Sequence, residues 1–263
     1  METEQRWITS NLGAGIIEIE LSSWKYFSIF VNEVMPQPNI YIWRGQRCDY
    51  WKLEPTLDRV LKKQDKVDSF STRWKHLDNF KNSTRGRRGT NPIELKSENE
   101  WWALGQHQGL ATPLLDWSRS PFVAAFFAFI EEGDNSCDKR AIWALSQVSV
   151  CSKSYLIETN TPEGYEKLVT DLIDPVLHDN PRQVSQSGLF TRSPDGVDME
   201  SWISKNFIGE EGVGVLIKFT VPEVDRNFVL KSLNRMNINP LMLFPDLYGT
   251  SLHTNLELQI DRY

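Results

Sequence analysis

The sequence lacks the segments that would send the chain out of the cytoplasm or into a bilayer. The first ten residues contain no basic segment followed by an apolar one, so we expect no secretory signal. The longest apolar run, Phe122 to Ile130, has nine residues, about half of what a bilayer requires. We therefore expect a cytoplasmic protein with no membrane partner.

Cysteine is scarce, and the common catalytic signatures are missing. The three cysteines, Cys48, Cys137 and Cys151, show no metal-binding spacing, and their odd number is typical of a reducing compartment. There is no phosphate-binding glycine loop with Lys-Ser/Thr, no dinucleotide glycine fingerprint, no His-Glu-x-x-His and no nucleophile elbow. These absences exclude the easily recognised enzyme classes and give no metal site, but they leave catalysis open.

The charge and the aromatic content restrict the kind of ligand. A net charge of −6 argues against a protein whose whole surface follows a polyphosphate backbone, although one local basic patch remains compatible with it. Ten Trp and thirteen Phe are many for 263 residues. The burial tendency of aromatic residues favours a core role for most of them, and the alternative is that some line a pocket for a flat ligand such as a nucleobase.

The hydrophobic pattern predicts one mixed α+β domain over residues 1–263, because the chain has no internal repeat, low-complexity tract or long linker. Residues 122–130 are apolar on every side, which predicts a buried central helix. Strands are expected near residues 40–45, 141–148, 213–221 and 255–260. The last of these rests on the alternation of Leu256, Leu258 and Ile260 with polar residues.

Polar residues between two expected helices mark a candidate site. Ser97-x-x-Glu100 has the form of a capping box that opens one helix, and Ser120 before Pro121 opens the apolar helix. The polar side chains in the turn between them are Gln106, His107, Thr112 and Asp116. Polar groups held by packed neighbours are typical of binding sites, so we expect one here.

His107 and Asp116 lie nine residues apart, on either side of the turn at Gly109. If they meet, the carboxylate would orient the imidazole and raise its pKa, an arrangement used for general acid/base catalysis. The alternative is that Asp116 braces the buried helix while His107 bonds to a main-chain carbonyl, because buried polar groups need partners whatever the function.

Three further sets of charged residues could take part in binding. Arg44, at the end of an expected strand and beside a glycine, suits bidentate capture of a phosphate or carboxylate, with an ordinary salt bridge as the alternative. Glu257, on the polar side of the last expected strand, would be the negative group of a pocket or else solvated surface. Arg85, Arg87 and Arg88 lie in a basic loop and either are solvated or meet a phosphate-bearing partner.

Five segments of the chain together resemble the FRG domain family. They are Trp-Arg-Gly-Gln at 43–46; Leu53-x-Pro55 with Arg59; Gln-His-x-Gly-Leu at 106–110 with Thr112 and Leu-Leu-Asp-Trp-Ser at 114–118; Gln186-x-Gly188-x-Phe190-Thr191; and Phe244-Pro245-Asp246-Leu247-x-Gly249. The segments follow the expected order over roughly residues 20–260. Trp43 replaces the phenylalanine of the family name, and Gln108 and Ala111 replace an aromatic residue and a proline, changes expected to tune a pocket.

The resemblance implies a toxin or effector in conflict between bacteria and phage, without fixing an activity. An arginine on an early strand, a Ser-x-Ser in mid-chain and a glutamate on a final strand are also similar to the layout of Arg-Ser-Glu ADP-ribosyltransferases. Here these positions are Arg44, Ser185-Gln186-Ser187 and Glu257. Asn255 departs from the Gln or Glu that usually stands two positions before the glutamate, which bears on the choice of acceptor.

Two functions follow as expectations. The first is an ADP-ribosyltransferase-like or NAD-consuming enzyme, with NAD as co-substrate. Its expected catalytic residues are Arg44, His107 and Glu257, and its expected cofactor-binding residues are Arg44, Gln46, Gln106, Thr112, Ser185, Gln186 and Ser187. The second is a non-catalytic module that binds a nucleotide, RNA or protein partner. A hydrolase using His107 and Asp116 is a third possibility that no metal-ligand cluster supports. Whether Arg44, His107 and Glu257 line one cleft separates the first function from the others.

Overall fold

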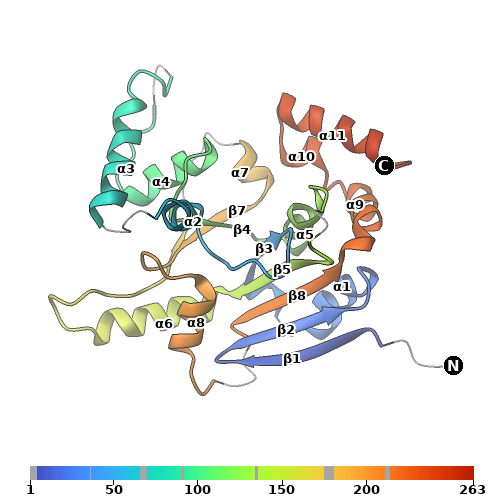
Figure 1. Ribbon diagram of the computed structural model, residues 1–263, viewed down its shortest axis with the longest axis horizontal. Helices are drawn as coiled ribbons and strands as arrows, with labels where there is room; N and C mark the ends of the chain where they lie inside the picture. The colour runs from blue at the N-terminus through green and yellow to red at the C-terminus, as the bar shows by residue number, and fades with distance from the viewer. Residues whose placement is uncertain are drawn as a thin grey trace.

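The computed structural model describes residues 5–35, 37–65, 70–89, 92–133, 136–174, 181–210 and 214–263, and it confirms the α+β fold (Figure 1). The described strands form one eight-stranded sheet in the order β1-β2-β8-β5-β3-β4-β7-β6. They are β1 (Trp7–Gly13), β2 (Ile16–Leu21), β3 (Tyr41–Gln46), β4 (Leu115–Ser118), β5 (Lys139–Ser146), β6 (Asp171–Ile173), β7 (Gly188–Arg192) and β8 (Leu216–Pro222). Strands β2 and β8 run parallel, and the other neighbouring strands run antiparallel.

Helices surround this sheet. The helices are α1 (Lys25–Ile29), α2 (Thr56–Lys63), α3 (Phe70–Ser83), α4 (Glu98–His107), α5 (Pro121–Phe129), α6 (Gln147–Asn160), α7 (Pro181–Ser185), α8 (Met199–Asn206), α9 (Arg226–Arg235), α10 (Pro240–Leu243) and α11 (Leu247–Gln259). The short turns are η1 (Phe30–Val34), η2 (Pro38–Ile40) and η3 (Glu223–Asp225). Within the described segments, no helix combines the length and the apolar character needed to cross a membrane.

The two faces of the sheet carry separate hydrophobic clusters, because side chains along a strand point alternately to opposite faces. On β5, Ile142 and Ala144 belong to the cluster that contains α1, α5 and α9. Trp143 and Leu145 belong to the cluster on the other face, which α6 and α8 cover. A third, smaller cluster joins α2, α3 and α4 to β7.

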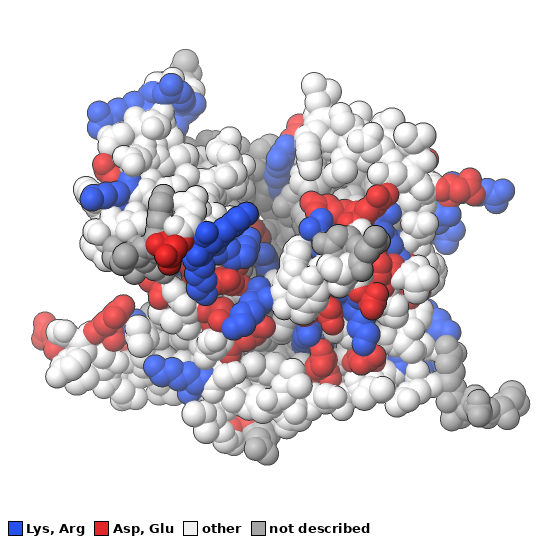
Figure 2. Space-filling model, viewed as in Figure 1, with Lys and Arg blue, Asp and Glu red and all other residues white. Residues whose placement is uncertain are grey.

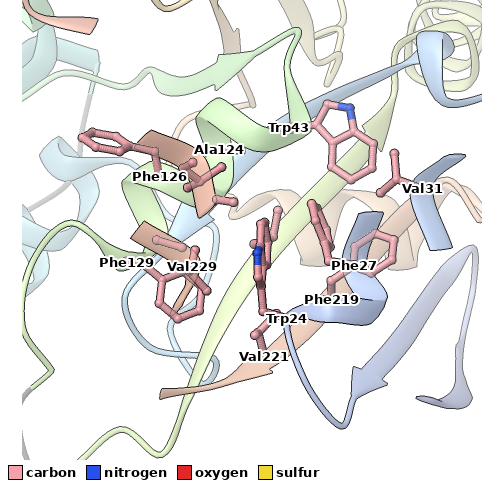
Figure 3. Close-up of a cluster of buried hydrophobic side chains, with 14 of the residues drawn as sticks. Trp24, Phe27, Val31, Trp43, Ala124, Phe126, Phe129, Phe219, Val221 and Val229 are labelled. Atoms are coloured by element: carbon pink, nitrogen blue, oxygen red, sulfur yellow. The ribbon is translucent and has the colours of Figure 1, made fainter. Parts of the chain in front are cut away.

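Aromatic rings fill the first cluster, as Figure 3 shows. The ring of Phe27 is 5.0 Å from that of Trp24, 5.5 Å from Phe219 and 6.2 Å from Trp43, between centroids. Edge-to-face and offset contacts of this kind add to the burial of each ring. Large rings from α1, β3 and β8 therefore hold these elements together on one face of the sheet.

The central helix expected at residues 122–130 is confirmed as α5. It begins at Pro121, where the side chain of Ser120 accepts a hydrogen bond from the Val123 amide at 3.3 Å. Most of its side chains are buried in the first cluster. The helix packs against β3, β4 and β5 and so forms one side of the space above these strands.

The strand expected at residues 255–260 is wrong, because these residues belong to the end of α11. Asp246 caps this helix by accepting hydrogen bonds from the amides of Tyr248 at 3.0 Å and Gly249 at 3.2 Å. Leu256 and Ile260 are buried, whereas Leu258 is 87% exposed. Burial of residues four positions apart is typical of a helix. The helix cap and this apolar face therefore outweigh the alternating pattern that predicted a strand.

The other three expected strands are confirmed, with different ends. The strand near 40–45 is β3, and the strand near 141–148 is β5, which stops at Ser146. The side chain of Ser146 accepts from the Ser149 amide at 3.3 Å, so residues 147 and 148 begin α6. The strand near 213–221 is β8, which starts at Leu216, and Val213 lies outside the described residues.

Two cysteines that are 89 positions apart form a disulfide. Cys48 follows β3 and Cys137 precedes β5, and their Cα atoms are 5.4 Å apart. Cys151 is a free and exposed thiol on α6. The spacing along the chain gave no sign of the pair, because the antiparallel pairing of β3 with β5 brings the two positions together.

Candidate functional site

The segment Trp43-Arg44-Gly45-Gln46 of β3 lies at the centre of the candidate site. Trp43 belongs to the aromatic core. A Cβ atom on Gly45 would lie 2.0 Å from the carbonyl oxygen of Ala124, so only glycine lets β3 approach α5 this closely. Both residues therefore fix the position of α5 against the strand.

Gln46, expected to bind a cofactor, is instead a structural residue. Its side chain is buried, with Oε1 accepting from Trp143 Nε1 at 2.7 Å and Nε2 donating to the Lys52 carbonyl at 3.0 Å. Because both ends of the amide have partners within the protein, Gln46 connects β3 with β5 and the loop after β3.

A cavity of about 390 Å³ opens where β3 and β4 separate. The two strands share a single pair of partners, Trp43 and Ser118, and beyond it the ladder ends. The volume falls within the range of about 300–1,000 Å³ that is usual for small-molecule sites. The cavity is lined by Trp43, Arg44, Gly45, Gln106, His107, Asp116, Trp117, Ser118, Ala124, Phe127, Arg182, Gln186 and Phe244.

Arg44 bridges the gap between the separated strands. Its NH1 donates to the carbonyl oxygen of Asp116 at 2.7 Å and lies 3.7 Å from the carboxylate Oδ2 of the same residue. Its Nε is buried and has no partner among the described residues, while 20% of the side chain remains exposed. Burial lowers the pKa of Arg44, Asp116 opposes this, and the nearby Arg59 adds to it. A guanidinium nevertheless stays charged in proteins.

Asp116 is held in the cavity by two side chains in series. The hydroxyl of Thr112 donates to Oε1 of Gln106, and Nε2 of Gln106 donates to Oδ2 of Asp116 at 2.7 Å. Because a carboxylate only accepts, the NH2 end of the amide faces Asp116, and its oxygen end is left to accept from the Thr112 hydroxyl. Thr112 is fully buried, whereas the side chain of Asp116 is 55% exposed, so the network holds an accessible negative charge in one position.

His107 and Arg182 face each other across the cavity from different parts of the chain. The ring of His107, at the end of α4, packs edge-on against Phe190 with 5.6 Å between centroids. The guanidinium of Arg182 lies 5.5 Å from the ring of Phe244 and pairs with Asp246 at 2.6 Å. The hydrogen bond from Arg182 lowers the pKa of Asp246. The cavity is therefore lined by His107 of α4, Arg182 of α7 and Phe244, which follows α10.

Residues 39–137 match the family model for the FRG domain. Over these residues the chain is similar to the FRG domain. No curated protein and no solved structure matches the chain. The matched residues run from η2 to the disulfide at Cys137 and include α4, β4 and α5. They supply Arg44, His107 and Asp116 to the cavity.

The opposite wall of the cavity lies outside the match to the FRG domain. Arg182 comes from α7, Gln186 from the turn after it, and Phe244 from the position that follows α10. Gln186 is fixed there, because its Nε2 donates to the Leu243 carbonyl at 3.1 Å and its own carbonyl accepts from the Ser118 hydroxyl at 2.7 Å. The site thus needs both the FRG domain and the strands and helices that follow it.

Glu257 is not among the residues that line this cavity. It lies on α11, where its side chain is 57% exposed and Oε1 is 3.7 Å from Nε2 of His253. The interpretation that placed it beside Arg44 depended on a final strand, and that strand is a helix. Of the three residues expected to be catalytic, the structure brings together Arg44 and His107.

Some of the residues expected to bind a cofactor line the cavity and others do not. Gln106 and Gln186 line the cavity. Thr112 does not line it, but its hydroxyl donates a hydrogen bond to Gln106. Ser185 and Ser187 flank Gln186 without lining the cavity, and Ser187 sits in a left-handed turn with φ of 48°. Of the three neighbouring residues Ser185, Gln186 and Ser187, the cavity is lined by Gln186.

Sequence reasoning missed Arg182 and Phe244 as site residues. Phe244 belongs to the Phe-Pro-Asp-Leu segment that carried part of the family resemblance, so a signal existed for that wall. Arg182 has no motif of its own. It is positioned by Asp246, whose second role is to cap α11.

Proposed function

We propose that the cavity of the FRG domain binds a nucleotide through its phosphate groups, and that NAD is the first ligand to test. The Arg44 side chain carries the proposal. It is a charged fork, partly exposed in the cavity, whose Nε donor has no partner among the described residues. Forked donors bind phosphate oxygens in pairs, and these charge-assisted hydrogen bonds are the strong ones.

The rest of the cavity supplies what a nucleotide needs besides a phosphate site. The rings of Phe127 and Phe244 give apolar surface for a base or nicotinamide. The carboxylate of Asp116 and the amide of Gln186 give hydrogen-bonding groups for ribose hydroxyls. A mixed lining with a few fixed polar groups is typical of cofactor sites.

Replacing Arg44 with alanine should weaken nucleotide binding by about tenfold to a hundredfold, the equivalent of about 1.5–3 kcal/mol for hydrogen bonds to a charged group. Arg44→Lys keeps the positive charge but loses the forked pair of donors, so its affinity for nucleotides should lie between those of wild type and Arg44→Ala. Titration calorimetry with NAD, ADP-ribose and ATP measures both variants. Arg262→Ala removes a cation from a side chain that is 91% exposed near the C-terminus, and serves as the matched control.

Thermal unfolding of each variant must accompany the titrations, because Arg44→Ala also removes the bond to the Asp116 carbonyl. Binding by wild type that survives intact in a folded Arg44→Ala variant would refute the phosphate role. Failure of wild type to bind any of the three nucleotides would refute the proposed function altogether.

A second candidate function is cleavage of NAD, and Asp116 favours it. Asp116 is the carboxylate of the cavity lining, and Gln106 and Thr112 hold it in place. In the reaction the bond between the ribose C1′ and nicotinamide breaks, and nicotinamide leaves with the bonding electron pair. Water adds to C1′ and releases a proton. A fixed carboxylate stabilises the positive charge that develops on the ribose.

Asp116→Asn should reduce the release of nicotinamide by about a hundredfold or more, the usual cost of removing one such electrostatic group. Glu257→Gln should turn over at the wild-type rate, since Glu257 lies on α11 and does not line the cavity. Chromatography of free nicotinamide measures both variants, and label from NAD on a macromolecule would detect transfer to an acceptor instead of water. Equal rates for wild type and Asp116→Asn, or loss of activity in Glu257→Gln, would contradict this assignment.

Consumption of NAD would also account for a toxin or effector role. Induction of wild type in a bacterial host should then lower cellular NAD and stop growth, while induction of Asp116→Asn to the same level should do neither. Growth arrest with both proteins at unchanged NAD would separate toxicity from this reaction.

A further inference from the structure

A second hollow of about 800 Å³ adjoins the cavity of the FRG domain. The two share His107 and Arg182, so they lie side by side at these residues. The second hollow runs between α3 and α4 on one side and the start of α11 on the other, and Arg87 and Arg88 belong to its lining. Figure 2 shows the surface hollowed between these two parts of the molecule.

A third hollow of about 440 Å³ continues from the second, with which it shares Thr84, Arg88 and Pro92. Its lining includes the cations Lys81, Arg85 and Arg88 and one carboxylate, Asp78. Figure 2 shows Lys and Arg side chains gathered over the end of α3. The three hollows therefore form one path from the Arg44 cavity to a basic surface.

Arg182 on this path is paired with Asp246, whereas Arg87 and Arg88 are held in place by main-chain carbonyls. Arg88 donates to the Ile93 carbonyl at 2.5 Å and its guanidinium lies 5.0 Å from the ring centroid of Trp101. Arg87 donates to the Ser83 carbonyl at 2.7 Å. Among the described residues, neither arginine is ion-paired with a carboxylate, which leaves both charges for an anion. Stacking on an aromatic ring keeps a guanidinium ordered at small entropic cost.

We infer that this path binds a single strand of nucleic acid whose terminal nucleotide occupies the Arg44 cavity. The inference rests on the proposed nucleotide site and names its substrate class. Successive phosphates of a strand are spaced along a groove, as Arg182, Arg87 and Arg88 are spaced along this one. A duplex end is too wide for a cavity of about 390 Å³, which selects a single strand. The net charge of −6 argues against phosphate contacts over the whole surface and is compatible with one local basic patch.

Fluorescence anisotropy of the full chain with a labelled ten-nucleotide single strand tests the inference, with RNA and DNA of one sequence and the matching duplex as separate arms. The double variant Arg87→Ala, Arg88→Ala should bind the strand about tenfold more weakly. Its slope of log affinity against log salt should fall by about 1.4, the value for two phosphate contacts on a single strand. The same variant should bind NAD and ATP as wild type does.

The control is the double variant Lys139→Ala, Arg262→Ala, which removes the same charge from exposed residues outside the three hollows. It should keep the affinity and the salt slope of wild type. Arg44→Ala should weaken binding of the strand as well, because the terminal nucleotide sits in its cavity. Binding of RNA or of DNA supports the inference, and a preference for RNA would locate contacts to the 2′-hydroxyl.

Three results would overturn the inference. They are an unchanged affinity and salt slope in the Arg87, Arg88 variant, equal binding of the duplex, and full binding of the strand by a folded Arg44→Ala variant. A wild-type protein that binds NAD or ATP but no strand would sink this inference and leave the proposed function standing. A protein that binds neither would remove both.

Discussion

Replacing Gly45 with alanine is expected to lower the free energy of unfolding by about 3 kcal/mol or more, at the upper end of what overpacking costs. The new Cβ would lie 2.0 Å from the carbonyl oxygen of Ala124 and 2.5 Å from the amide nitrogen of Ala128. Both are main-chain atoms of a helix that is buried against three strands, so neither can move without displacing α5. Denaturation in urea, followed by tryptophan fluorescence, measures the loss.

Gly209→Ala is the comparison that isolates the steric effect. Gly209 has a φ of 81° and open space where its Cβ would be, so alanine there suffers only from the left-handed backbone, about 1 kcal/mol. If the two variants lose equal stability, close approach to α5 is not what Gly45 provides. Because Ala124 and Phe127 of α5 line the cavity, a folded Gly45→Ala protein should also bind nucleotides less well.

The Trp-Arg-Gly-Gln segment therefore combines three structural residues with one that carries charge to the cavity. Trp43 and Gly45 position α5, and Gln46 connects β3 to β5. Of these four residues, Arg44 is the one that brings a positive charge to the cavity. Substitutions of the three structural residues should act first on stability, and substitutions of Arg44 first on binding.

The elements that could be predicted from the sequence are those with a local physical cause. The capping box at Ser97 and Glu100 forms as expected and starts α4, and Ser120 with Pro121 starts α5. A cap needs only residues within one turn, so the sequence contains all of it. Strand β3 also lies where its β-branched and aromatic residues placed it.

The last segment was misassigned because two patterns overlap in it. Leu256, Leu258 and Ile260 fit a strand, while Leu256 and Ile260 alone fit a helix. The deciding signal was Asp246, ten residues earlier, which caps α11. In the sequence, Asp246 was assigned only to a family motif and not to a helix cap. The predicted location of Glu257 on a strand was wrong for the same reason.

The candidate site was predictable only in part, since its two walls meet through long-range packing. Gln106, His107 and Asp116 are close in sequence, and their grouping was expected. Their hydrogen bonds were not, because the partner of Asp116 is Gln106 and its neighbour is Arg44 from a strand more than 70 positions away. No local pattern indicates that β3 and β4 separate after one pair of residues, which is what creates the cavity.

The second large effect on stability is expected at the C-terminal end of α5, where a buried arginine donates hydrogen bonds to main-chain carbonyls. Arg140 is fully buried, and its NH1 and NH2 donate to the carbonyls of Ala128 at 2.9 Å and Glu131 at 3.0 Å. The same guanidinium forms a two-point ion pair with Glu223, with NH2 and Oε1 2.7 Å apart. It therefore satisfies the carbonyls at the end of α5 and joins β5 to the turn after β8.

Arg140→Met should lower the free energy of unfolding by about 3–5 kcal/mol, because it leaves Glu223 without its partner in a partly buried position. Adding Glu223→Met should recover part of this lost stability, because removing both charges destabilises the protein less than leaving one buried charge without its partner. Recovery should remain incomplete, because the Ala128 and Glu131 carbonyls still lack a donor, at about 1–3 kcal/mol for each buried group. Lys139 is next to Arg140 in the chain and forms an exposed ion pair with Glu20. Lys139→Ala should therefore lower the free energy of unfolding by at most about 1 kcal/mol. Urea denaturation of the four proteins tests the order, and a single Arg140→Met variant as stable as Lys139→Ala would show that α5 does not depend on this arginine.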